Sequence, residues 1–271
     1  MIKLLRGRER PRALRSGLRR FSRRWKPRPT PEITQNSVSL RGLPDAFHGF
    51  RVAQLTDIHH GIYTPLAMVE RAVEETNRLG PDVVVLTGDF VTFSSDYVNP
   101  VAAALGKLRA RLGIFAVLGN HDYHAGADLV ARELRRQGID VLRNSHTAFR
   151  SGRQRLWLAG VDDLWHNCDL RGATRGIPRD GLKVLLSHNP GIIRQAAGYG
   201  FDLVLSGHTH GGQIRLPVLG SLYLYRTNRF SMGWDRLHDT QIYVSRGLGK
   251  SLLPFRIGCP PEIAMFEFRA A

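Results

Sequence analysis

The chain has 271 residues, of which 42% are hydrophobic and 23% are charged, a composition that excludes a protein disordered throughout. Its two cysteines, Cys168 and Cys259, are too few for a disulfide framework, and we interpret them as small buried residues in a reducing compartment. The formal net charge of +16 is unevenly placed, because residues 1–29 hold twelve Lys and Arg and one acidic residue and so carry +11 of it.

Residues 1–30 are predicted to form a basic tail, followed by one domain over residues 31–271. Leu14, Leu18, Phe21 and Trp25 are spaced so that a helix would align them on one face, with arginines around them. Such a helix suits an anionic membrane surface, whereas a disordered arm would attract any polyanion, nucleic acid included, and both readings stay open. Because we find neither a long apolar run nor an export signal, we expect a cytoplasmic protein, with peripheral attachment to the inner face of the membrane as the variant.

Five segments of the body share one pattern, an apolar run followed by small residues and then a side chain that can bind a metal. They are residues 51–57, 83–89, 114–121, 183–188 and 203–210. Short apolar runs bounded by Gly are typical of strands buried on both faces, so we predict a central, largely parallel sheet. Ligands of such sheets bind at the carboxyl ends of the strands, where the five endings would meet.

Helical patterns separate these runs. Thr64 is a candidate N-cap with Pro65 at the first helical position, and the helix would end at Gly80. Residues 125–137 and a segment opening at Pro190 have similar spacing. From residue 139 onward, shorter strand-like pieces at 147–149, 155–159, 221–225, 241–245 and 263–268 predict a second sheet packed on the first. The expected fold class is therefore α/β, with four layers in the order α-β-β-α and helices outside both sheets.

The side chains at the strand ends are rich in oxygen and nitrogen donors. In chain order they are Asp57, His59, Asp89, Asn120, His121, His188, His208 and His210. A structural zinc site needs four ligands and usually thiolates, so this set fits better two metal ions that share a carboxylate. A shell without sulfur favours Mn²⁺, with Fe or Zn²⁺ as alternatives. Taken singly, each Asp or Asn after a strand is as well explained by helix capping.

The motifs that carry these residues resemble those of the calcineurin-like metallophosphoesterases. They are Asp57-Ile58-His59, Gly88-Asp89, Gly119-Asn120-His121-Asp122, His188 and Gly207-His208-Thr209-His210. The resemblance implies that Asp57, His59, Asp89 and His210 hold one metal and that Asp89, Asn120, His188 and His208 hold the other. It implies that hydroxide between the two metals attacks phosphorus, and that His121 is catalytic, donating to the phosphate or to the leaving group.

The C-terminal motifs resemble the bacterial YaeI/YkuE-type branch, which is similar to a UDP-diacylglucosamine pyrophosphatase of the LpxG type in lipid A biosynthesis. That resemblance implies a hydrolase of phosphodiester or pyrophosphate bonds, with a lipid-linked substrate at the membrane surface as one expectation. The alternatives are a general nucleotide or nucleic-acid phosphodiesterase and a non-catalytic protein that binds polyanions; no protein partner is implied. Arg215, Arg246 and Arg256 are candidates to bind phosphate, Asp122 to orient a ligand or to start a helix, and Trp165 to touch substrate or pack on the surface.

Overall fold

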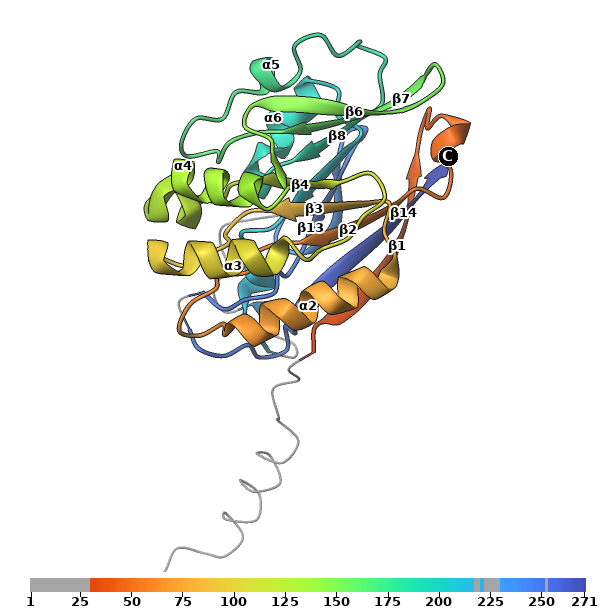
Figure 1. Cartoon of the computed structure of the whole chain (residues 1–271). Coiled ribbons are helices and arrows are strands. Elements are labelled where there is room, and N and C mark those ends of the chain that lie inside the picture. Colours follow the sequence, from red (N-terminus) through yellow and green to blue (C-terminus); the bar gives the residue numbers. More distant parts are fainter. Residues whose placement is uncertain (1–29, 217–219, 222–229, 252) are drawn as a thin grey trace, which may run out of the picture.

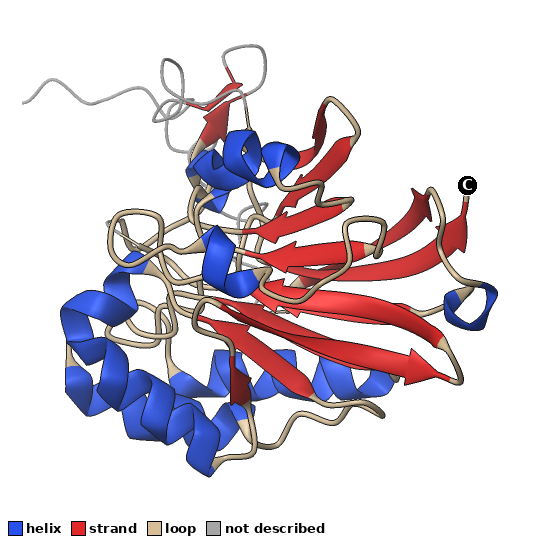
Figure 2. Cartoon of the chain, turned by 90° about the horizontal axis from the view of Figure 1, so that it is seen from above, coloured by secondary structure: helices blue, strands red, loops and turns tan. Residues whose placement is uncertain are grey.

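A computed structural model describes residues 30–216, 220–221, 230–251 and 253–271, so residues 1–29 of the predicted basic tail lie outside the described residues. Two sheets pack face to face, and helices cover their outer faces (Figures 1 and 2). This confirms the expected four-layer α/β architecture. Among the helices of the described part of the chain, none has both the length and the apolar character needed to span a bilayer.

The first sheet contains four parallel strands together with the first and the last strand of the described chain. Its strands, in spatial order, are β1 (Glu32–Leu40), β14 (Glu262–Ala270), β2 (Arg51–Leu55), β3 (Val83–Thr87), β4 (Ile114–Val117) and β5 (Asp140–Val141). Strands β2 to β5 run parallel, while β14 is antiparallel to β2 and parallel to β1. All five residues of β3 are buried, as its unbroken apolar run predicts.

The second sheet takes the remaining long strands. They are β12 (Gly233–Leu237), β13 (Thr240–Val244), β9 (Leu203–Ser206), β8 (Lys183–Leu186), β7 (Gln154–Gly160) and β6 (Ser145–Ser151). The pair β10 (Arg215–Leu216) and β11 (Gly220–Ser221) lies apart. The two predicted sheets are present, but the prediction that all five runs ending in donor side chains lie in one of them is wrong. Three of the runs form β2, β3 and β4 in the first sheet, and two form β8 and β9 in the second. The predicted strand 263–268, which is β14, belongs to the first sheet, because an apolar run reports burial but not its pairing partner.

Three apolar cores bind the layers together. The helices α2 (Leu66–Leu79), α3 (Val98–Leu105) and α4 (Asn120–Arg136) pack on the outer face of the first sheet, while α5 (Leu170–Ala173) and α6 (Ile193–Gly198) pack on that of the second. A middle core joins the sheets through residues such as Val85, Phe115, Leu186, Leu205 and Phe266. Short 3-10 turns cover Asp45–Phe47, Ser95–Tyr97, Pro190–Ile192 and His210–Gly212.

The helix boundaries differ in detail from those predicted. Helix α2 has Pro65 as its N-cap, and the Thr64 hydroxyl instead accepts a hydrogen bond from the Lys250 backbone N–H at 3.1 Å. Helix α4 begins five residues before the predicted Ala125, so Asn120 lies in its first turn. The segment opening at Pro190 is helical, as predicted. Of the predicted strand 221–225, only Ser221 lies within the described residues.

A buried carboxylate, that of Glu262, links the two sheets. It accepts hydrogen bonds from the Tyr243 hydroxyl at 2.5 Å, from the Thr34 hydroxyl at 2.7 Å and from the Arg246 backbone N–H at 2.8 Å. Burial raises the pKa of Glu262, but these donors and the Arg246 charge outweigh it, and the net pKa lies below the ordinary value. Its stabilising effect is therefore present above the unfolded-state pKa and is lost as the pH falls through the lowered folded-state pKa.

We expect Glu262→Gln to destabilise the protein by about 2–4 kcal/mol near pH 7, because the neutral amide cannot accept all of these donors. Urea unfolding measures the change, with Glu267→Gln, at a partly exposed side chain of the same strand, as the matched control. The difference in free energy of unfolding between wild type and the Glu262→Gln protein should narrow toward pH 3. An equal difference at every pH would contradict the assigned role of the ionised carboxylate.

Candidate metal centre

The predicted donor residues meet at the carboxyl ends of the strands of both sheets. Asp57 and His59 follow β2, and Asp89 follows β3. Asn120 and His121 open α4 just after β4, whereas His188 follows β8, and His208 and His210 follow β9. Strands β7, β8, β9 and β13 of the second sheet also run parallel. The parallel strands of both sheets thus contribute to one site between the sheets.

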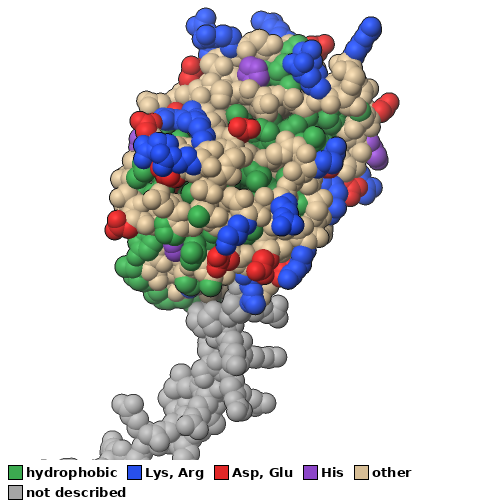
Figure 3. Space-filling view, in the orientation of Figure 1, with side chains coloured by type: hydrophobic (Ala, Val, Ile, Leu, Met, Phe, Trp, Pro, Cys, Tyr) green, Lys and Arg blue, Asp and Glu red, His purple; other side chains and the backbone are tan. Residues whose placement is uncertain are grey.

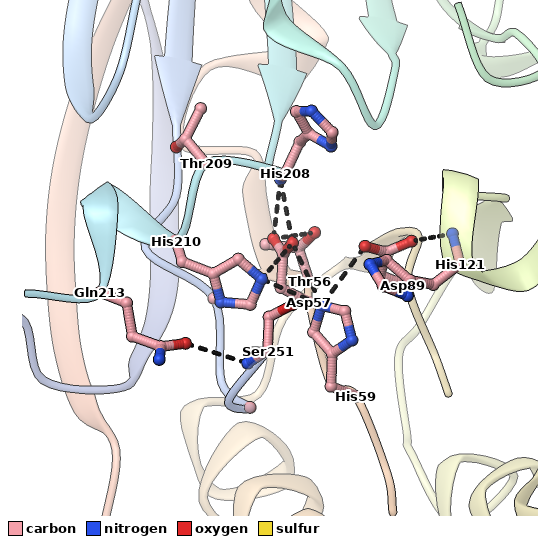
Figure 4. Close-up of polar contacts among 12 residues, drawn as sticks. Thr56, Asp57, His59, Asp89, His121, His208, Thr209, His210, Gln213 and Ser251 are labelled. Atoms are coloured by element: carbon pink, nitrogen blue, oxygen red, sulfur yellow. Dashed lines mark hydrogen bonds and ion pairs between the residues drawn. The ribbon is translucent and has the colours of Figure 1, made fainter. Parts of the chain in front are cut away.

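The first group of donor atoms surrounds a point near Asp57. The Nε2 atoms of His59 and His210 lie 2.9 Å apart, and His210 Nε2 lies 3.2 Å from Asp57 Oδ1 (Figure 4). Asp89 Oδ2 lies 3.3 Å from His59 Nε2. The residues predicted for the first metal are therefore neighbours, with their donor atoms facing one another.

The second group shares the same Asp89 oxygen. Asp89 Oδ2 lies 3.1 Å from His188 Nε2, and His188 Nε2 lies 3.1 Å from His208 Nδ1. His208 Nδ1 in turn lies 3.0 Å from the Asn120 side-chain oxygen. His188 Nδ1 donates to the Thr87 carbonyl at 2.8 Å, which holds the ring with Nε2 toward the site.

The spacing of these atoms fits bound cations. Two ligand atoms about 2.1 Å from one metal and at right angles to each other lie about 3.0 Å apart, close to the separations in both groups. Two imidazole nitrogens that face each other inside a buried site need a proton or a cation between their lone pairs. The groups Asp57–His59–His210 and Asp57–Asp89–His188 each place their donor atoms within 4.8 Å of one another.

Unusual backbone conformations aim several of these side chains. Asp57, His59, Asp89, His208 and His210 all have positive φ, between 46° and 73°. This region is unfavourable for residues other than glycine and is tolerated where the surrounding structure imposes it, often at functional sites. Five of the seven predicted ligands therefore occupy strained positions, which spacing in a sequence does not reveal.

Two motif glycines make room for the carboxylates. A Cβ on Gly119 would collide with the Asp89 side chain, and a Cβ on Gly207 would collide with the Asp57 side chain. The residue before Asn120 and the residue before His208 must therefore lack a side chain. The close approach of backbone and carboxylate gives these motif positions their physical meaning.

Neighbouring charges shift the pKa values of several residues in the site. Burial lowers the pKa of His188, but the Asp89 carboxylate outweighs it and raises the pKa to about 10. Burial raises the pKa of Asp89, while His188 and His59 bring it well below the usual range. Burial and the neighbouring His188 lower the pKa of His208 to about 4, so its ring is neutral near pH 7 and has a lone pair that can bind a metal ion.

Residues 50–212, more than half of the chain, match the family model described as calcineurin-like phosphoesterase. The chain belongs to the calcineurin-like phosphoesterase family. The sequence motifs and the arrangement of the donor atoms both agree with this assignment.

Curated relatives cover most of this phosphoesterase. It is 35% identical over 257 residues to the transmembrane protein with metallophosphoesterase domain of Danio rerio, a match that covers 89% of this chain and 58% of that protein. It is 32% identical to the uncharacterized metallophosphoesterase YkuE of Bacillus subtilis, covering 88% and 86% of the two chains. It is 32% identical to the phosphodiesterase YaeI of Escherichia coli, covering 80% and 82%. These matches confirm the resemblance to the YaeI/YkuE branch and support a metal-dependent phosphoester hydrolase, although the chain spans less than two thirds of the Danio rerio relative.

His121 of this phosphoesterase lies next to the donor groups but belongs to neither of the two groups described above. Its backbone N–H donates to Asp89 Oδ1 at 2.9 Å, its Nδ1 donates to the Thr92 carbonyl at 2.6 Å, and its ring lies 4.8 Å from that of His59. One further group, His59–Asp89–His121, also brings three donor atoms within 4.8 Å. Distance alone therefore leaves His121 two roles, that of a ligand and that of a proton donor.

Asp122 combines the two roles considered for it. Its fully buried carboxylate accepts from the Gly119 backbone N–H, which caps α4, and from the backbone N–H groups of Asp89 and Phe90 at 2.8 Å each. Burial and the Asp89 charge raise the pKa of Asp122 to about 7. The helix start thus holds the strained loop that carries Asp89.

Two residues with supporting roles are not evident from the sequence pattern. Thr92 fixes His121 through its carbonyl, and Arg256 Nη2 lies 3.1 Å from His210 Nδ1. The Arg256 guanidinium also donates to the carbonyls of Gly249 and Arg246, while Arg246 pairs with Glu262. These two arginines, considered above as phosphate ligands, are thus engaged with protein groups. No motif signals either contact, because both join loops distant in sequence.

Proposed function

We propose that this chain hydrolyses phosphodiester or pyrophosphate bonds with the aid of two divalent cations, Mn²⁺ being favoured. Residues 31–271 form the catalytic unit. Asp57, His59, Asp89 and His210 would hold one ion, and Asp89, Asn120, His188 and His208 the other. The observation that carries the proposal is the position of Asp89 Oδ2, which lies within 3.3 Å of a donor nitrogen in each group. When bound, such an ion pair polarises the phosphoryl group and activates a water molecule.

The chain's own residues supply positioning and a proton. Because Nδ1 of His121 is tied to the Thr92 carbonyl, Nε2 is the nitrogen that can hand a proton to the leaving oxygen. The Asp89 side chain accepts the His121 backbone N–H, so the shared ligand and the proton donor are held in one fixed arrangement.

For the substrate we favour a lipid-linked phosphoester at a membrane surface, such as UDP-diacylglucosamine. The basic tail supports this choice, since Lys and Arg near anionic lipid each contribute about 1 kcal/mol. On the face of the body shown in Figure 3, basic and acidic side chains are interspersed, so that face offers no comparable patch of one sign. The relative named a phosphodiesterase supports diester cleavage.

An activity screen after metal reconstitution tests the reaction. Purified protein is stripped with a chelator, reloaded with Mn²⁺, Fe²⁺, Zn²⁺ or Mg²⁺, and assayed on a monoester, a diester and a pyrophosphate. We expect activity to vanish on stripping, to return with a transition metal, and to favour the diester or the pyrophosphate. Full activity in the stripped protein would contradict the proposal, and a preference for cyclic nucleotides or oligonucleotides would favour a nucleotide or nucleic-acid phosphodiesterase.

Vesicle binding tests the role of the tail. The full chain is compared with a chain lacking residues 1–29 on vesicles with and without anionic lipid. We expect the full chain alone to sediment with anionic vesicles, and this binding to weaken as salt is raised. Equal sedimentation of the two chains would rule out the tail as the membrane contact.

A further inference from the structure

Two exposed aromatic side chains rest against histidines of the metal centre. Phe93 is 62% exposed, and its ring centroid lies 5.1 Å from that of His121. Trp165 is 63% exposed, and its ring meets His208 edge-on, with centroids 4.9 Å apart. One ring thus lies beside the candidate proton donor and the other beside a ligand of the second group.

Neither ring belongs to a loosely held loop. Next to Phe93, Thr92 accepts from the His121 ring through its carbonyl and donates from its hydroxyl to the His59 carbonyl at 3.3 Å. Next to Trp165, the buried Asp163 accepts from the Trp165 backbone N–H at 3.1 Å and from the His166 ring at 2.9 Å. The protein therefore holds both backbones firmly while leaving both rings in solvent.

These positions make sense as substrate contacts. A large apolar ring exposed to water does not gain the free energy that burial would provide. The polar donor set does not need an aromatic neighbour to bind a cation. A phosphodiester or pyrophosphate carries a substituent on each side of the bond that is cut, and the two rings flank different parts of the centre. Each ring offers a face on which a flat or apolar substituent can pack.

We propose that Phe93 and Trp165 are specificity-determining residues that bind the two substituents of the substrate. Phe93, beside His121, packs on the leaving group, and Trp165, beside His208, packs on the group that stays on phosphorus. The inference rests on the proposed hydrolysis of diesters or pyrophosphates and names the chemistry of the substrate, which carries an aromatic, nucleobase or other apolar group on both sides.

Two chromogenic diesters with the same leaving group separate the roles: 4-nitrophenyl phenyl phosphate and 4-nitrophenyl methyl phosphate. Trp165→Ala should lower kcat/KM about 10-fold on the phenyl diester and less than about 2-fold on the methyl diester. Phe93→Ala should lower it by a similar factor on both. Trp165→Phe should restore most of the loss, and Tyr199→Ala, which removes an exposed aromatic remote from the centre, should change neither. Equal effects of Trp165→Ala on the two diesters would overturn the assignment.

A binding measurement separates this inference from the proposed reaction. Diphenyl phosphate should shield tryptophan fluorescence of the wild type from acrylamide quenching, whereas dimethyl phosphate should not, and neither should shield the Trp165→Phe protein. If diphenyl phosphate shields Trp165 but no diester is cleaved, the proposed reaction fails and the aromatic contact stands. If diesters are cleaved without shielding, the aromatic contact fails and the reaction stands.

Discussion

Asp89→Asn should abolish both metal binding at full stoichiometry and catalysis, lowering kcat/KM by about 10³-fold or more. The substitution keeps the shape of the side chain but removes the charge that both donor groups share, since Asp89 Oδ2 lies 3.3 Å from His59 Nε2 and 3.1 Å from His188 Nε2. Elemental analysis of the purified protein and a diesterase assay with added Mn²⁺ measure the two losses together.

The control for this experiment is Asp239→Asn, which makes the same chemical change at a side chain that is 91% exposed. It should leave metal content and turnover at wild-type levels. Urea unfolding of the Asp89→Asn protein is needed beside it, because the wild-type carboxylate also accepts the His121 backbone N–H. A folded Asp89→Asn protein with full activity would refute the two-metal assignment.

His121→Ala should separate catalysis from metal binding. We expect the turnover number to fall by about 10²–10⁴-fold, the usual worth of a general acid, while metal content stays near normal. The reason is that His121 Nδ1 donates a hydrogen bond to the Thr92 carbonyl and that His121 belongs to neither of the two donor groups that share Asp89. His48→Ala, which makes the same change at an exposed histidine, serves as the matched control.

The dependence on the leaving group makes this test sharper. A proton donor matters most for a poor leaving group, so the loss in the His121→Ala protein should be larger for a phenyl ester than for a 4-nitrophenyl ester. If metal is lost along with turnover, His121 is a ligand instead, as the close grouping of His59, Asp89 and His121 would allow.

The donor set could be predicted from local sequence because each donor follows a short apolar run and small residues. Such a run forms a buried strand by its own composition, and the end of a parallel strand is a fixed place in any α/β fold. Asp57, Asp89 and His188 are therefore close in space although more than 130 residues separate the first from the last. The motif glycines 119 and 207 carry a further local signal, since only a residue without a side chain fits beside those carboxylates.

The division of the strands between two sheets was beyond this kind of reasoning. An apolar strand buries both faces whichever neighbours it pairs with, so β8 and β9 look the same in sequence whether they continue the first sheet or build a second. Strand β1 was missed for a related reason: its alternating exposed and part-buried residues contain few apolar ones, and its pairing with β14 joins segments more than 220 residues apart.

Sequence alone thus indicated which donor side chains meet at the centre and that they follow buried strands, because local composition encodes both. The tertiary structure decided what those residues meet: the pairing of Arg256 with His210, the hold of Thr92 on His121, and the aromatic rings of Phe93 and Trp165 at the centre. Each of these contacts joins separate segments whose distance depends on how strands pair and sheets pack. That packing is a property of the whole chain, which no single motif contains.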